Sequence, residues 1–185
     1  LSAWTSYSKI DQYIFLPVQS LSLAVSTFVG QNLGIGNTQR AKKGSFLAWG
    51  LSSVCTLLII IPIMLFAPFW ASIFNEDASV VELATRLLYC ITPFYFCCSV
   101  NQIFSASLRG AGSSRAPMLI MLCSFIGVRQ LYLYVITNYV SNDLLPIGMG
   151  YPLGWLCCSI AILFYYLRFD FAGAAARTKA RSTSI

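Results

Sequence analysis

Five long apolar segments most constrain the fold of this 185-residue chain. They cover residues 10–29, 44–66 with a possible continuation to Phe74, 84–108, 117–139 and 147–167. A helix needs about 20 mostly apolar residues to cross the hydrocarbon core of a bilayer. A lone strand in lipid would leave its backbone groups unpaired, so each segment is predicted to be a helix. The predicted fold class is therefore all-α, a polytopic integral membrane helical bundle with about five transmembrane helices.

The composition agrees with a chain that is mostly surrounded by lipid. Charged residues make up 10% of the sequence and apolar residues 57%, whereas a soluble domain carries roughly 25% charged residues. Histidine is absent, which removes the commonest general base and metal ligand. We therefore expect no enzyme activity, no catalytic residues, no metal site and no cofactor.

The connections between the segments alternate between basic and acidic. Basic residues gather in the first and third connections and after the last segment, namely Arg40, Lys42, Lys43, Arg109, Arg115, Arg168, Arg177, Lys179 and Arg181, with Asp170. The second connection holds Glu76, Asp77 and Glu82 against Arg86, and the fourth holds only Asp143. Cytoplasmic loops collect Lys and Arg. The pattern predicts a cytoplasmic C-terminus and explains the net charge of +6 by topology, so no nucleic-acid partner is expected.

The first segment carries a polar stripe. Gln12, Gln19 and Ser26 are spaced seven apart, with Ser22 between the last two. Seven residues are almost two helical turns, so these side chains share a face. Glutamine in a span faces protein or water rather than lipid. The stripe is therefore either a wall of a substrate path or a set of interhelical hydrogen bonds.

The third segment repeats this pattern with a second set of polar residues, which are Thr92, Tyr95, Ser99, Asn101 and Gln102. Phe94 and Phe96 flank Tyr95 and give an aromatic cluster. Ring faces attract flat cationic molecules. The same aromatic residues would also suit an ordinary packed core, so both interpretations stay open.

Arg129 is the one charge deep inside a predicted span. Such a charge is costly in lipid and marks a functional candidate. We expect it to face the bundle as a structural or gating charge bonded to carbonyls or to a partner from outside this chain. Direct substrate contact and snorkelling to the outer surface are the alternatives.

The first connection also contains a distinctive motif, FVGQNLGIGNTQRAKKG over residues 28–44. Glycine takes positive φ freely, so Gly34 and Gly36 can end the first helix. Asn37 or Thr38 can cap a short basic helix that leads into the second segment. This motif closely resembles a signature of the multidrug and toxic compound extrusion (MATE) family, and its candidate residues are Gly30, Gln31, Asn32, Gly34, Gly36 and Arg40. The stretches LRGAGSSRAP (108–117), GVR (127–129) and YPLGW (151–155) are also similar to that family and keep its order.

The resemblance implies part of a twelve-helix fold in which two six-helix lobes surround a cavity. The chain looks like a fragment of the C-terminal lobe, with an incomplete set of helices over residues 1–170 and a polar cytoplasmic tail over 171–185. Residues 1–8 would be the end of a preceding helix or its outer loop. The implied partners are the lipid bilayer and an N-terminal lobe of the same polypeptide.

The resemblance also implies a function, which is ion-gradient-driven antiport by alternating access in the plasma (inner) membrane. The substrate would be a small organic molecule, with cations among the candidates, and the coupling ion a proton or sodium. Some relatives bind this ion at an acidic residue in the helix matching 84–108, but that segment has none here. The coupling acid is therefore expected in the other lobe, and Asp11 is the one acid near a span. The alternatives are a flippase for a lipid-linked molecule and a non-transporting membrane scaffold.

Overall fold

The computed structural model describes residues 2–73, 77–139 and 143–182, and all regular structure within them is helical. The first half contains α1 (Ser2–Gly34), α2 (Thr38–Leu65), α3 (Ala67–Ser72), α4 (Ala78–Ile91), the 3-10 turn η1 (Thr92–Phe94) and α5 (Tyr95–Gly110). The second half contains α6 (Arg115–Leu122), the π-helix η2 (Cys123–Val128), α7 (Arg129–Tyr139), α8 (Leu144–Gly148), α9 (Gly150–Arg168) and α10 (Phe171–Ser182).

The five predicted spans are confirmed. Five helical stretches of the described chain are long and apolar enough to cross a membrane, and they are Asp11–Gly34, Thr38–Leu65, Ala78–Gly110, Arg115–Tyr139 and Leu145–Arg168. Three of them are interrupted, and one of these is the fifth, in which a turn at Met149 separates α8 from α9. Pro93 lies in η1, between α4 and α5, and η2 separates α6 from α7. Pro17, by contrast, lies inside an α1 that is helical throughout.

Two boundaries differ from the sequence-based expectation. Residues 2–8 belong to α1 itself, so they are neither a preceding helix nor a loop. The second span ends at Leu65, and its expected continuation forms the separate helix α3, which has a proline in its first turn. Phe74, the expected end of that continuation, and Glu76 lie outside the described residues. The expected tail begins at residue 171 as predicted, and its described part is the helix α10, whose Phe171 side chain is only 2% exposed.

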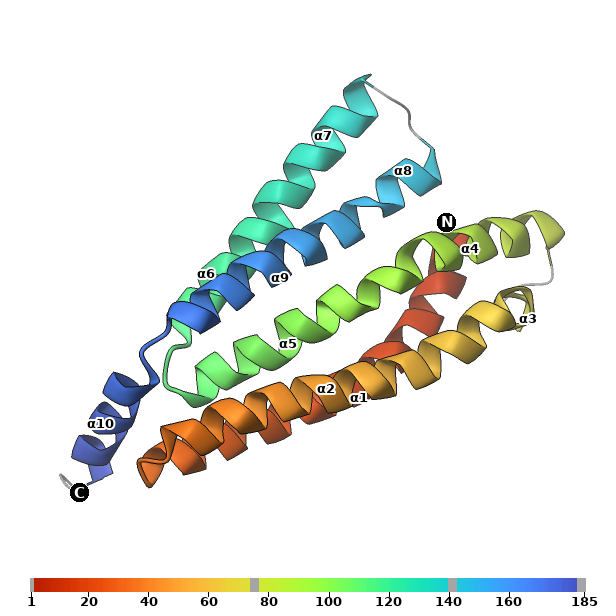
Figure 1. Cartoon of the computed structure of the whole chain (residues 1–185). Helices are drawn as coiled ribbons and strands as arrows, with labels where there is room; N and C mark the ends of the chain where they lie inside the picture. The colour runs from red at the N-terminus through yellow and green to blue at the C-terminus, as the bar shows by residue number, and fades with distance from the viewer. Residues whose placement is uncertain (1, 74–76, 140–142, 183–185) are drawn as a thin grey trace.

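The helices form a packed group from which two spans diverge, one made of α6 and α7 and the other of α9. Figure 1 shows α1, α2 and α5 side by side, with α6, α7 and α9 leaning away from them toward the top of the view. Two apolar clusters hold the group together. One joins α1, α5, α9 and α10 around Phe104 and Ile162, and the other joins α1, α2, α4 and α9 around Ile14 and Leu88.

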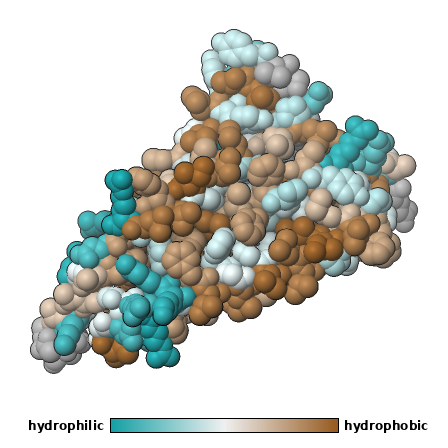
Figure 2. Space-filling view, in the orientation of Figure 1, coloured by the Kyte–Doolittle hydropathy of each residue, from teal (hydrophilic) through white to brown (hydrophobic). Residues whose placement is uncertain are grey.

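The two ends of the molecule differ in charge. The basic end carries the α1–α2 turn, the α5–α6 turn and α10, with Arg40, Arg109 and Arg168 among its residues. The acidic end carries the α3–α4 and α7–α8 connections, with Asp77 and Asp143. Figure 2 shows hydrophilic residues gathered at the basic end and hydrophobic residues over the middle of the visible face. That distribution fits a bundle whose middle lies in hydrocarbon.

The α1–α2 turn follows its predicted chemistry. Helix α1 ends at Gly34, and Gly36 adopts a φ of +78°. Asn37 caps the next helix, because its side-chain oxygen accepts a hydrogen bond of 3.0 Å from the backbone N–H of Arg40. The expected short basic helix is not separate, since α2 runs on without a break from Thr38.

Candidate substrate path and buried charge

The polar stripe of α1 divides between two sides of the helix. Ile14, Val18 and Val25 are buried against the rest of the bundle. Gln12 and Gln19 are exposed on the other side. Ser22 is buried and Ser26 is half-buried, so both lie on or beside the packed side. The structure therefore leaves two amide side chains open on the surface of a membrane span.

The second polar set lies inside the bundle instead. Thr92, Tyr95, Ser99 and Asn101 are each at most 2% exposed, and Gln102 is half-buried. The Ser99 hydroxyl donates to the carbonyl of Phe96 at 2.8 Å, and Asn101 accepts from Ser105 at 3.4 Å. In this conformation the four buried side chains are not open to the surface that carries Gln12 and Gln19.

Tyr95 is part of an aromatic cluster that joins three elements and extends from the middle of the spans toward the acidic end. Its ring lies 5.6 Å from that of Phe15 in α1 and 5.1 Å from that of Trp155 in α9. Tyr151 lies 6.4 Å from Trp155 and stacks on Trp4 at 5.2 Å between centroids. Such ring pairs contribute beyond the area they bury. The cluster thus ties the start of α9 to both α1 and α5.

Arg129 faces this cluster from the start of α7. Its guanidinium carbon lies 3.7 Å from the centroid of the Tyr151 ring, which is a close cation–π contact. Its Nε atom is buried, with no hydrogen-bond partner in the described part of the chain. The residue directly follows the π-helix η2, a helix type frequent at functional sites. The sequence indicated that Arg129 needs a partner, but the ring of Tyr151 was not identified as that partner.

A second group of buried polar side chains was missed by the sequence reasoning. The hydroxyls of Ser45 in α2 and Ser107 in α5 are 2.7 Å apart and fully buried. Along the same side of α2, Ser52, Thr56 and the indole nitrogen of Trp49 are buried without a hydrogen-bond partner among the described residues. The spacing of residues 45, 52 and 56 places these hydroxyls on one helix face, and that spacing was the available signal.

The motif of the α1–α2 connection builds a turn and a close helix contact. The Asn32 amide donates to the carbonyl of Phe28 at 2.7 Å, and the Arg40 guanidinium lies 5.9 Å from the Phe28 ring. Gly30 lies against the backbone of Gly110 in α5. Gln31 and Gly34 are exposed, as is Gly36. The arrangement is one that holds α1, α2 and α5 together at the basic end.

A protein-family model described as MatE matches residues 1–135. That match covers well over half of the chain. The chain belongs to the MatE family. The predicted family resemblance is thereby confirmed, together with an all-helical membrane fold.

Curated relatives of this MatE chain carry transport names. It is 27% identical over 165 residues to the probable multidrug resistance protein YoeA of Bacillus subtilis, and the aligned region covers 89% of this chain and 36% of that protein. It is 26% identical over 167 residues to the FAD transporter of Shewanella oneidensis, and the aligned region covers 90% of this chain and 36% of that protein. The MatE chain therefore spans a little over a third of the length of these relatives.

Solved structures show the same fold. The eukaryotic MATE transporter AtDTX14 superposes with a TM-score of 0.89 at 14% identity, over 97% of this chain and 40% of that one. An inward-facing multidrug resistance MATE transporter superposes with a TM-score of 0.78 at 19% identity, over 99% and 41%. Within the described residues of the MatE chain, no three His, Cys, Asp or Glu side chains gather as a metal site.

Proposed function

We propose that this chain forms part of a secondary active exporter of small organic molecules. Transport would proceed by alternating access, driven by a proton or sodium gradient across the plasma membrane, with the C-terminus in the cytoplasm. The proposal rests on membership of the MatE family and on the transport names of its relatives. Export by a two-lobe protein also requires a second lobe, which would face the surface that α1 leaves open.

The structural observation that supports this proposal best is the exposure of Gln12 and Gln19. Gln19 lies within the span Asp11–Gly34 and Gln12 in its first turn, both on the side of α1 that the bundle does not cover. An amide in hydrocarbon without a hydrogen-bond partner costs several kcal/mol, on the order of 4–8 by transfer from water to an alkane. The side of α1 with these glutamines is therefore expected to face water or another polar protein surface. Substrate sites in secondary transporters lie at such interfaces between repeats.

The substrate class follows from relatives and aromatic content together. One relative is named for FAD and others for multidrug resistance. Tyr95, Tyr151 and Trp155 supply ring faces between the middle of the spans and the acidic end of the bundle. Flat organic molecules with aromatic groups are the class that such rings would accept. These rings are packed in the present conformation, so contact with a substrate would require the helices to move.

A chimeric transporter tests the proposal. The region of Bacillus subtilis YoeA that matches this chain is replaced by the chain itself, and ethidium export is followed in everted vesicles. We expect export that starts when a proton or sodium gradient is imposed and stops when an ionophore collapses it. A lipid-linked substrate in place of the dye tests the flippase alternative.

Membrane expression and melting of the chimera serve as the control. A chimera that inserts normally and melts cooperatively, yet moves neither dye nor lipid under any gradient, would support the scaffold alternative and contradict the proposal.

A further inference from the structure

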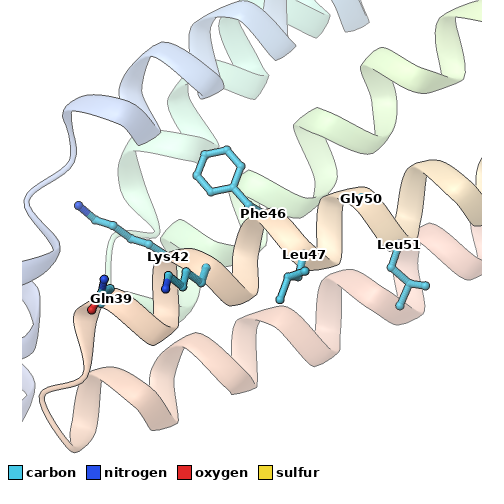
Figure 3. Close-up of a pocket in the computed structure, with 7 residues that line it drawn as sticks. Gln39, Lys42, Phe46, Leu47, Gly50 and Leu51 are labelled. Atoms are coloured by element: carbon cyan, nitrogen blue, oxygen red, sulfur yellow. The ribbon is translucent and has the colours of Figure 1, made fainter.

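A surface groove runs along α2 from the basic end into its membrane span. It has a volume of about 730 Å³ and is lined by Gln39, Lys42, Lys43, Phe46, Leu47, Gly50 and Leu51. Figure 3 shows Gln39 and Lys42 near the start of the helix, with Leu47 and Leu51 farther along. Twelve residues of helix correspond to roughly 18 Å. The groove is therefore polar and cationic at one end and apolar at the other.

The apolar end has the properties of a surface that lipid chains cover. Leu47 is 75% exposed and Leu51 is 54% exposed, although both lie within the span Thr38–Leu65. A Cβ atom added at Gly50 would meet no other atom within 4 Å, so the glycine leaves open space between its neighbours. Exposed leucines around an open glycine in hydrocarbon provide a channel for an acyl chain.

The cationic end lies where the groove leaves the span. Lys42 and Lys43 are both exposed, and no carboxylate is among the residues that line the groove. The ammonium group of Lys42 lies 5.2 Å from the centroid of the Phe171 ring in α10. That contact holds the Lys42 side chain at the groove mouth while leaving its charge available for an anion.

We propose that this groove binds an anionic glycerophospholipid of the surrounding bilayer. Its phosphate and negative headgroup lie against Lys42 and Lys43, and the amide of Gln39 donates a hydrogen bond. One acyl chain runs past Phe46 and Gly50 to Leu51. Charge complementarity selects anionic over zwitterionic headgroups, and the apolar end selects a lipid over a free phosphate. The site does not depend on the transport activity proposed above.

Native mass spectrometry of the full chain tests this site. The chain is released from micelles that contain equal amounts of phosphatidylglycerol and phosphatidylcholine with the same acyl chains. We expect retained phosphatidylglycerol to exceed phosphatidylcholine. Lys42→Ala and Lys43→Ala should each lower that preference about fivefold. A basic residue near an anionic membrane surface contributes about 1 kcal/mol, which corresponds to that fold-change. Gly50→Leu fills the channel and lowers retention with every charge intact.

Arg115→Ala is the matched control, because it removes one exposed positive charge at the same end but outside the groove. It should leave the lipid preference unchanged. Lys43→Ala removes an exposed side chain and leaves the Lys42–Phe171 contact in place, so it keeps the test valid if Gly50→Leu or Lys42→Ala lowers the melting temperature.

Four outcomes would overturn the proposal. The first two are equal retention of the two lipids, and a loss of lipid preference in Arg115→Ala as large as that in the Lys variants. The other two are full displacement of the lipid by free glycerol phosphate, and a dimer of the chain that Gly50→Leu converts to monomer, which would place a second copy on this surface.

Discussion

The guanidinium carbon of Arg129 lies 3.7 Å from the centroid of the Tyr151 ring. The contact joins the first residue of α7 to the second residue of α9, immediately after the π-helix η2. A charge inside a membrane span is thus held against the negative face of an aromatic ring. Tyr151 in turn stacks on Trp4, so the same contact reaches α1.

Removing the Tyr151 ring should destabilise the bundle, while removing its hydroxyl should not. Tyr151→Ala leaves the Arg129 charge without its ring, so the melting temperature should fall. Tyr151→Phe keeps the ring face and should melt close to the natural protein. A double-mutant cycle with Arg129→Ala should give a coupling free energy of about 1–2 kcal/mol, as for a desolvated cation–π pair.

The pair Arg168–Phe164 provides the comparison for this cycle. Its guanidinium carbon lies 4.3 Å from the ring centroid, but both residues are exposed. Its coupling should not exceed about 1 kcal/mol. Equal couplings for the two pairs, or none between Arg129 and Tyr151, would show that Arg129 is not held by the ring.

Replacing Gly110 by alanine should push α1 and α5 apart where the two helices pack together. A Cβ atom at this position would overlap the backbone carbonyl of Ser26, which belongs to a helix and cannot turn aside. Gly110→Ala should therefore cost about 1–3 kcal/mol, as overpacking usually does. Gly50→Ala is the matched control, because its methyl group meets nothing within 4 Å. It should stabilise α2 by about 0.5–1 kcal/mol, and a similar loss at both positions would contradict the close contact.

Single cysteines should report the orientation of the chain. In a background without the seven natural cysteines, a membrane-impermeant maleimide added from outside should label Ser79→Cys and Asp143→Cys. Thr38→Cys and Ser113→Cys, at the basic end, should react only after the membrane is opened. Asn75 and Asn142 would be alternative outer probes, but they lie outside the described residues. Labelling of the basic-end probes in intact cells would reverse the proposed topology.

The pKa of Asp77 should depend on Ser79. The Ser79 hydroxyl donates to the Asp77 carboxylate at 2.8 Å and its backbone N–H at 3.0 Å, and these hydrogen bonds hold the pKa of Asp77 below its ordinary value. Because the folded-state pKa is depressed, this cap stabilises α4 above the ordinary pKa, and the stabilisation is lost as pH falls through the folded-state value.

Ser79→Ala should raise the pKa of Asp77 toward its ordinary value, as followed by carboxyl ¹³C NMR. Ser72→Ala removes a hydroxyl that bonds to the carbonyl of Phe69 instead, so it should leave that pKa unchanged. An unaltered Asp77 titration in Ser79→Ala would rule out the hydroxyl as the main cause.

The sequence was sufficient for the spans because hydrophobic length is a local property. The end of α1 at Gly34 was also predictable, since Gly36 acts through its backbone freedom alone. The π-helix η2 was not, because nothing in CSFIGV distinguishes i→i+5 from i→i+4 bonding. The docking of α10 was missed because, among its residues with described burial (171–180), Phe171, Ala174 and Ala175 are the buried ones, and a polar tail can show the same composition.

The candidate site was less accessible from sequence than the fold. Periodicity placed Gln12 and Gln19 on one helix face, but it could not say which face the bundle would cover. The structure buries Asn101 and exposes Gln19, although both are amides in predicted spans. Partners such as Arg129 and Tyr151 are more than twenty positions apart, so only the folded chain brings them together.

We propose that the exposed glutamines of α1 face a polar path through which substrates move. The most direct measurement compares ethidium efflux and melting temperature for Gln19→Ala in the YoeA chimera, with Leu23→Ala as the control. Leu23 is on the same side of α1 and 73% exposed but has no polar group. We predict that Gln19→Ala changes the efflux rate or substrate preference at an unchanged melting temperature, while Leu23→Ala changes neither. A lower melting temperature with unchanged efflux, or two fully normal variants, would contradict the claim.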